Sequence, residues 1–129
     1  KLTIEWDALP AAWDNRPIPR LIVQPLVENA FIHGLEELDG HGTLRFTVKA
    51  DDRALTLAVE DNGDRLTDGM LHELADRLRA SADGFETTGV LNVHRRLVLK
   101  FGAASGLRVS RSELGGLRVE ATLPAEEDN

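Results

Sequence analysis

The segment Leu26–Gly34, LVENAFIHG, places a carboxylate, an amide and an imidazole inside an otherwise apolar run. Asn29 and His33 are four residues apart, so in a helix they share one face. An amide oxygen suits a hard cation such as Mg²⁺, and an imidazole N–H can donate to phosphate. Taken alone, however, Asn29 is explained more simply as a partner for a neighbouring backbone group.

Two later motifs carry further polar groups. In VEDNGD, which ends an apolar strand pattern, Asp61 could accept a hydrogen bond from an exocyclic amine, and Gly63 would let the backbone come close. In TTGVLNV, residues Thr87, Thr88 and Gly89 precede a helix, where free N–H groups and the helix dipole favour phosphate. Each motif also has a structural explanation, namely a strand-exit turn and an N-cap threonine.

Composition excludes several classes of protein. The 129 residues predict one domain, and the net charge of −7 argues against sequence-independent nucleic-acid binding. There is no cysteine, which excludes disulfides and thiolate sites. No apolar run approaches the length of a membrane span, and the first residues lack a signal-peptide pattern. We therefore expect a soluble, cytoplasmic domain.

The first long helix is expected from Pro19 to about Leu35, because its apolar residues fall at helical spacing. Pro25 does not suit a helix interior, so either the helix kinks there or its regular part starts near Gln24.

Alternating and helical patterns predict the remaining elements. The resulting order, β-α-β-β-α-α-β-β, favours an α+β two-layer sandwich with helices on one face of a mainly antiparallel sheet. His41 and His94 are interpreted as solvent-exposed. The patterns predict a strand over 1–7, a loop over 8–19, a hairpin over 43–63, helices over 67–84 and 87–102, and a second hairpin over 106–124.

Together, the motifs LIVQPLVENAFIHGLE, LAVEDNG, TTGVLNVHRRLVLKFG and GGLRVEATLP closely resemble the ATP-binding catalytic domain of LytS-type sensor histidine kinases. These kinases share a superfamily, GHKL, with gyrase, Hsp90 and MutL. The resemblance covers roughly residues 17 to 124. It implies a Bergerat-type α/β sandwich, with a mixed, mainly antiparallel sheet covered on one face by about three helices. It also implies a single domain over 1–129, with an ATP lid over about 64–88.

The resemblance further implies ATP and Mg²⁺ as ligands and assigns roles to individual residues. Asn29 would be the Mg²⁺ ligand, and Asp61 would accept from the adenine amino group. The other positions that the family motifs match are His33 on the phosphate or adenine side, Gly63 beside the ring, Thr88 and Gly89 against the phosphates, and Asn92 at the start of the next helix.

Three positions depart from the family pattern. Ile32 stands where a lysine usually precedes His33, and this removes one phosphate contact. Arg65 and Thr87 replace glycines of the lid, which stiffens a segment that must fold over the phosphates. We therefore expect weaker ATP binding than is usual, although the Arg65 guanidinium could itself contact phosphate.

Glu28 is the candidate catalytic residue. Gyrase- and Hsp90-like ATPases carry a water-activating glutamate four residues before the metal-binding asparagine, but that position is Pro25 here, so such hydrolysis is not expected. Glu28 lies about 100° around the helix from Asn29. It could orient a water on the metal or form a surface ion pair, and both interpretations stay open.

The resemblance also implies partners. The acceptor histidine would lie in a separate dimerisation domain that this segment does not contain, and the phosphoryl group would pass on to a response regulator, of LytTR type. We expect a cytoplasmic domain of an inner-membrane-anchored bacterial protein, with no nucleic-acid partner and no direct membrane contact. The alternatives are a degenerate, non-catalytic module for regulation or partner docking, and an anti-sigma-factor serine kinase, against which the QPLVEN signature argues.

Overall fold

The computed structural model describes residues 2–13, 17–36, 38–80 and 89–124. Within these ranges it contains three α-helices and five strands. In chain order they are β1 (Leu2–Trp6), α1 (Pro17–Ala30), β2 (Gly42–Ala50), β3 (Ala54–Asp61), α2 (Asp68–Ala80), α3 (Gly89–Phe101), β4 (Arg108–Arg111) and β5 (Leu117–Pro124).

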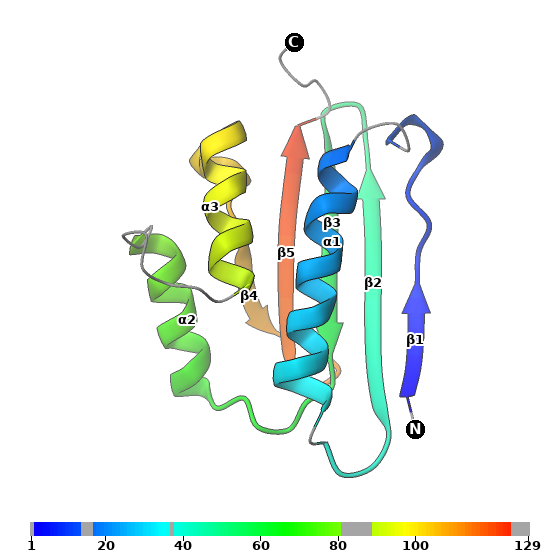
Figure 1. The fold of residues 1–129 in the computed structure, drawn as a ribbon, viewed down its shortest axis with the longest axis vertical. Coiled ribbons are helices and arrows are strands. Elements are labelled where there is room, and N and C mark those ends of the chain that lie inside the picture. The colour runs from blue at the N-terminus through cyan, green and yellow to red at the C-terminus, as the bar shows by residue number, and fades with distance from the viewer. Residues whose placement is uncertain (1, 14–16, 37, 81–88, 125–129) are drawn as a thin grey trace.

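The strands form one sheet in the order β1-β2-β3-β5-β4. β1 runs parallel to β2, and the other neighbouring pairs are antiparallel. All three helices lie on the same face of this sheet (Figure 1). The predicted α+β sandwich with a mixed, mainly antiparallel sheet is therefore confirmed, as are both predicted hairpins.

Helix α1 runs without interruption from Pro17 to Ala30, with Pro25 in its interior. It therefore begins earlier than predicted, and the alternative of a regular start near Gln24 is wrong. After Ala30 the chain continues as a π-helical turn over Phe31–Leu35, which is closed by the N–H of Glu36 donating to the Phe31 carbonyl (2.8 Å). Wide turns of this kind occur preferentially at functional sites, and this one carries His33 and Gly34.

The core lies between the helices and the covered face of the sheet. Full burial of one large apolar side chain contributes about 1.5–3 kcal/mol. The side chains that are buried almost completely include Ile22 and Leu26 of α1, Phe46 of β2, Leu55, Leu57 and Val59 of β3, Val93 and Leu97 of α3, and Leu123 of β5.

β1 forms the one edge of the sheet over which no helix lies (Figure 1). Its apolar side chains Leu2, Ile4 and Trp6 are 45%, 56% and 54% exposed. Trp6 still contacts the buried Phe46, with ring centroids 4.5 Å apart. Within the described ranges, no helix combines the length and the apolarity that crossing a bilayer requires.

His94 is not solvent-exposed as predicted, because it joins three elements. Its Nδ1 accepts a hydrogen bond from the buried Leu107 N–H (2.9 Å), and its ring also hydrogen-bonds the backbone of Leu78, near the end of α2. The last carbonyls of a helix have no partner within the helix, so this contact satisfies one of them. Burial lowers the pKa of His94, and the hydrogen bond to Leu78 partly offsets that effect. His41, in contrast, is exposed as predicted.

Replacing His94 with leucine should destabilise the fold by about 1–3 kcal/mol, because two buried backbone groups lose their partner. The folded pKa of His94 lies below that of the unfolded chain, which is about 6.5. Below that pH the unfolded chain takes up a proton that the folded chain resists, so stability should fall as the pH falls. His94→Leu should lack this part of the pH dependence.

Urea unfolding at several pH values tests both expectations, with His41→Leu as the control. Equal stability of the two variants would contradict the bridging role of His94.

Candidate functional site

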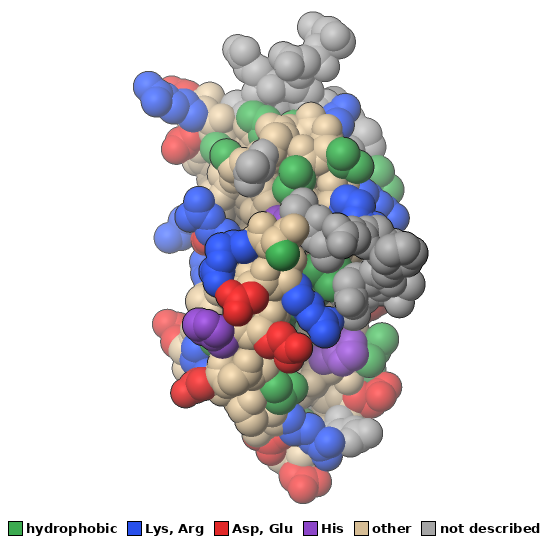
Figure 2. Space-filling model, turned by 90° about the vertical axis from the view of Figure 1, so that its left-hand side faces the viewer, with side chains coloured by type: hydrophobic (Ala, Val, Ile, Leu, Met, Phe, Trp, Pro, Cys, Tyr) green, Lys and Arg blue, Asp and Glu red, His purple; other side chains and the backbone are tan. Residues whose placement is uncertain are grey.

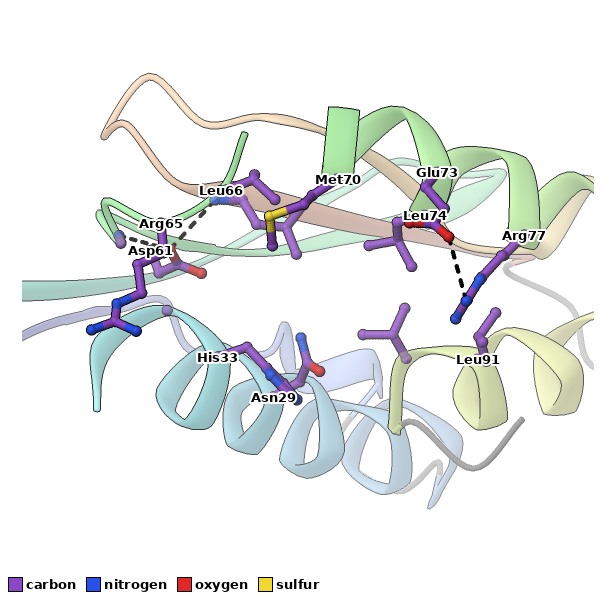
Figure 3. A pocket seen from close by; sticks show the side chains of 14 residues that line it. Asn29, His33, Asp61, Arg65, Leu66, Met70, Glu73, Leu74, Arg77 and Leu91 are labelled. Carbon is purple, nitrogen blue, oxygen red and sulfur yellow. Dashed lines mark hydrogen bonds and ion pairs between the residues drawn. The ribbon is translucent and has the colours of Figure 1, made fainter. Parts of the chain in front are cut away.

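A cleft of about 330 Å³ lies between the three helices and the ends of β3 and β5 (Figure 3). It brings together five of the predicted site residues, which come from two distant parts of the sequence. These are Asn29, His33, Asp61, Gly63 and Arg65. The other lining residues are Gly34, Leu66, Met70, Glu73, Leu74, Arg77, Val90, Leu91 and Leu117.

Asp61 is the last residue of β3 and is only 3% exposed. Its Oδ1 accepts a hydrogen bond from the Gly63 N–H (2.9 Å) and a longer one from the Leu117 N–H (3.4 Å). Among the described residues, no donor reaches the other carboxylate oxygen, Oδ2. Burial raises the pKa of Asp61, and the two backbone hydrogen bonds oppose that rise. The cleft therefore contains a buried acceptor with one oxygen still to be satisfied.

Three glycines from separate segments enclose this carboxylate. A Cβ on Gly34 would come 2.5 Å from Asp61 Cγ, and a Cβ on Gly63 would come 2.5 Å from the Gly34 carbonyl oxygen. A Cβ on Gly116, in the turn before β5, would overlap Asp61 Oδ1. The cleft therefore needs glycine at all three positions. Of these three glycines the sequence motifs assigned a role only to Gly63, because only the fold shows that Gly34 and Gly116 lie beside Asp61.

Asn29 and His33 reach the cleft from α1 and the π-helical turn that follows it, and face α2 across it (Figure 3). No group of three His, Asp or Glu side chains among the described residues could hold a metal by itself. Mg²⁺, however, is usually bound through one or two protein oxygens together with waters and substrate phosphates. A single amide oxygen at Asn29 therefore fits a Mg²⁺ ion that arrives with a phosphorylated ligand.

The predicted phosphate-side residues are described only in part. Thr87 and Thr88 lie outside the described residues. Gly89 is the first residue of α3, and the next two residues, Val90 and Leu91, line the cleft. Asn92 is half-buried and is not among the lining residues.

Glu28 and Ile32 lie outside the cleft. The carboxylate of Glu28 accepts a hydrogen bond from the Gln24 amide (3.1 Å), so in this structure it neither faces the cleft nor pairs with a described cation. Ile32 is 55% exposed and lines an apolar groove with Ile4 of β1. Ile32 is not among the residues that line the cleft, and the expected loss of a phosphate contact at this position stays a prediction.

Arg111, at the end of β4, holds the segment that leads into α2. Its guanidinium donates to the Leu66 carbonyl (2.8 Å) and to Asp68 Oδ1 (2.8 Å). Thr67 caps α2 by accepting from the Met70 N–H (3.1 Å). No local sequence pattern predicts this role of Arg111, since Leu66 and Asp68 are 45 and 43 residues away from it.

The chain matches a known protein family and individual members of it. The chain matches, over residues 14–127, the model of a family described as histidine kinase-, DNA gyrase B-, and HSP90-like ATPase. It is 35% identical to the sensor histidine kinase YpdA of Escherichia coli K12 over 115 residues, or 89% of this chain and 19% of YpdA. It is 29% identical to the sensor protein LytS of Bacillus subtilis over 110 residues, or 85% of this chain and 18% of LytS. The chain thus spans about a fifth of the length of these relatives.

A solved structure shares the fold. The ATP binding domain of PrrB from Mycobacterium tuberculosis superposes with a TM-score of 0.61 at 20% sequence identity. The match covers 98% of this chain and 82% of that one.

Replacing Gly34 with alanine should destabilise the protein by about 1–3 kcal/mol, because the added methyl group overlaps the buried Asp61 carboxylate. Gly69→Ala is the matched control, since its Cβ would meet nothing closer than 3.9 Å and alanine favours the helix there. Thermal unfolding of both variants measures the difference. Equal stability of Gly34→Ala and Gly69→Ala would mean that the Asp61 site has room for a methyl group at position 34, contrary to this structure.

Replacing Asp61 with asparagine should leave the protein at least as stable as the wild type at neutral pH. The folded pKa of Asp61 is raised above its unfolded value of about 3.9, so its ionisation opposes folding, fully so above the folded pKa. The advantage of Asp61→Asn should therefore shrink as the pH falls through the folded pKa. Thermal unfolding at a series of pH values tests this. A variant that is less stable than the wild type at neutral pH would mean that the hydrogen bonds to the carboxylate outweigh its burial.

Proposed function

Because the chain belongs to the family of histidine kinase-, DNA gyrase B- and HSP90-like ATPases, we propose that it is the ATP-binding catalytic domain of a two-component sensor histidine kinase. Family membership confirms the resemblance drawn from the sequence motifs. In this proposal the domain binds Mg-ATP and donates the γ-phosphate to a histidine in a separate dimerisation domain, from which it passes to a response regulator. The observation that carries the proposal is the buried Asp61 carboxylate, whose Oδ2 has no described donor, in one cleft with Asn29.

The Asp61 end of the cleft suits adenine. Its Oδ2 can accept from the 6-amino group, whereas guanine carries an acceptor at that position and would leave two acceptors facing each other. Gly34 and Gly63 leave room for a ring, and the apolar side chains of Leu66, Met70 and Leu74 line the same cleft.

The opposite end suits the phosphates. The N–H groups of the first turn of α3 have no partner within the helix, and the helix dipole there favours negative charge. Asn29 would hold Mg²⁺ between this turn and the Asp61 end, and His33 would donate to phosphate. The bound Mg²⁺ would neutralise charge on the triphosphate during transfer. Thr87, Thr88 and Gly89 complete the phosphate side in the proposal, as the family motif implies.

The lid in this proposal comprises residues 64–88, with α2 as its helical part. Arg111 anchors its first residues to β4, and His94 hydrogen-bonds Leu78 near the end of α2. Arg65 lines the cleft beside Asp61, so its guanidinium lies nearer to the adenine end than to α3 (Figure 3).

The chemistry would be divided between domains. Pro25 stands where related ATPases carry a catalytic base, and Glu28 faces away from the cleft. We therefore propose that this domain positions ATP, and that the acceptor histidine and its base come from the dimerisation domain. The proposal includes a LytTR-type response regulator, an inner-membrane anchor elsewhere in the protein, and no nucleic-acid partner.

Titration calorimetry with Mg-ATP and Mg-GTP tests the proposal. The wild type should bind ATP saturably and prefer it to GTP. Asp61→Asn should weaken ATP binding about 10- to 100-fold, since it loses a hydrogen bond to a charged group, and should reduce the preference for ATP because its amide can donate to guanine O6. Asn29→Ala should weaken Mg-ATP but leave adenosine binding unchanged.

Gly69→Ala serves as the control for these titrations, because this residue does not line the cleft. The absence of binding at millimolar nucleotide would reject the kinase function and support a degenerate regulatory module. An Asp61→Asn variant with an unchanged preference for ATP would reject the assignment of the adenine end.

A further inference from the structure

Arg111 lies at the end of β4 and does not line the cleft, but it joins two segments that border the Asp61 end. Its Nη1 donates to the Leu66 carbonyl (2.8 Å) and to the Gly115 carbonyl (3.1 Å). Its Nη2 donates to Asp68 Oδ1 (2.8 Å). Leu66 lines the cleft, and Asp68 is the first residue of α2. One guanidinium therefore links the start of α2 to the turn between β4 and β5.

That turn, residues 112–116, is itself held to β3 at two points. Ser112 Oγ donates to Glu60 Oε1 (2.8 Å), and both residues are only 3% exposed. The Gly116 N–H donates to the Asp61 carbonyl (3.1 Å). A buried hydrogen bond to a carboxylate is strong, so the turn is a firm support for the arginine. The guanidinium therefore fixes the start of α2 relative to the strand that ends in the buried aspartate.

The position of the segment before α2 decides the shape of the adenine end. Between Gly63 and Asp68 the chain forms neither helix nor strand, so contacts with other segments determine where it lies. The cap on α2, from the Met70 N–H to Thr67, is a contact within the segment and does not place it relative to β3. Leu66 and Met70 both line the cleft and face α1 across it (Figure 3). A shift of this segment would therefore change the space that an adenine ring enters.

The simplest alternative is a surface ion pair with no part in binding. The Asp68 side chain is 98% exposed, and charged side chains of both signs are mixed over the face of the molecule that carries α2 (Figure 2). Ion pairs at such exposed positions contribute little to stability. Two of the three contacts of Arg111, however, go to backbone carbonyls, and these fix the path of the main chain rather than balance a charge.

We propose that Arg111 is a positioning residue for nucleotide binding, which holds residues 66–68 at the distance from Asp61 that accommodates adenine. This inference rests on the proposed function of the cleft as an ATP site. Without the guanidinium, the segment would occupy its binding position for only part of the time, and the apparent affinity falls in proportion to that fraction. Because the effect lies at the adenine end, it should be equal for every ligand that carries adenine, whatever its phosphates.

Calorimetry with Mg-ATP and NMR titration with adenosine test this on four variants. Arg111→Gln should weaken the binding of both ligands by the same factor, about 5- to 10-fold, through the loss of charged hydrogen bonds that hold the segment. Arg111→Lys should recover part of both affinities, since an ammonium restores the charge but not the planar fork. Asp68→Asn should weaken both by less than about 3-fold, because it removes only an exposed pair. Arg108→Gln is the matched control and should change neither affinity, because Arg108 begins the same strand, is exposed and does not line the cleft.

Hydrogen exchange without nucleotide gives a readout that does not depend on binding. The amides of residues 66–71 should exchange faster in Arg111→Gln than in Arg108→Gln, because the segment has lost its link to β4. Circular dichroism of the two variants should agree, which shows that a loss of affinity is not due to unfolding. Equal exchange in the two variants would overturn the proposal.

The binding results separate this inference from the proposed function. If the wild type binds Mg-ATP and Arg111→Gln binds it equally well, the positioning role is overturned and the ATP site stands. If Arg111→Gln loses affinity for Mg-ATP but not for adenosine, the arginine acts on the phosphate side and the proposal is again wrong. If the wild type binds neither ligand, the proposed function fails and this inference fails with it.

Discussion

The burial of the Asp61 carboxylate is the constraint on which the rest of the cleft depends. A buried ionised group needs hydrogen bonds, and here one oxygen takes them from the backbone while the other has no described donor. Three glycines from different segments must then meet around it, which fixes how the end of β3, the π-helical turn and the turn before β5 approach one another. Burial raises the pKa of Asp61, which means that the ionised carboxylate destabilises the folded state. Such a cost is typical of a residue retained for binding.

Helix α1 takes part in both the core and the cleft, because one of its faces is buried against the sheet and another lines the cleft. Ile22 and Leu26 are buried in the core, whereas Asn29 faces the cleft. The wide turn after Ala30 carries the chain on to His33 and to the glycine that touches Asp61. Polar residues therefore occur in an apolar run because one helix both closes the core and forms a wall of the cleft.

Much of this could be predicted from the sequence, because strand alternation and helical spacing are local signals. The alternation of Leu55, Leu57 and Val59 predicted β3, and motif order predicted that Asn29 and Asp61 share a cleft. The bridging role of His94 could not be predicted, because its partners belong to elements that meet only in the folded chain.

The contact of Arg111 with Leu66 could not be predicted for the same reason. Nor could the surface that Ile32 lines. The spacing of apolar residues predicts that Ile32 belongs to a helix. Which groove its side chain lines depends on the position of β1, which the spacing does not predict. Long-range contacts therefore account for most of what the sequence left open.

The most direct measurement is a crystal structure of the chain with Mg²⁺ and a non-hydrolysable ATP analogue. In that structure the adenine amino group should donate to Asp61 Oδ2, and Asn29 Oδ1 should coordinate a Mg²⁺ ion bound to the phosphates of the same nucleotide. A nucleotide bound elsewhere, or one that contacts Asp61 with its phosphates pointing away from Asn29 and α3, would contradict it.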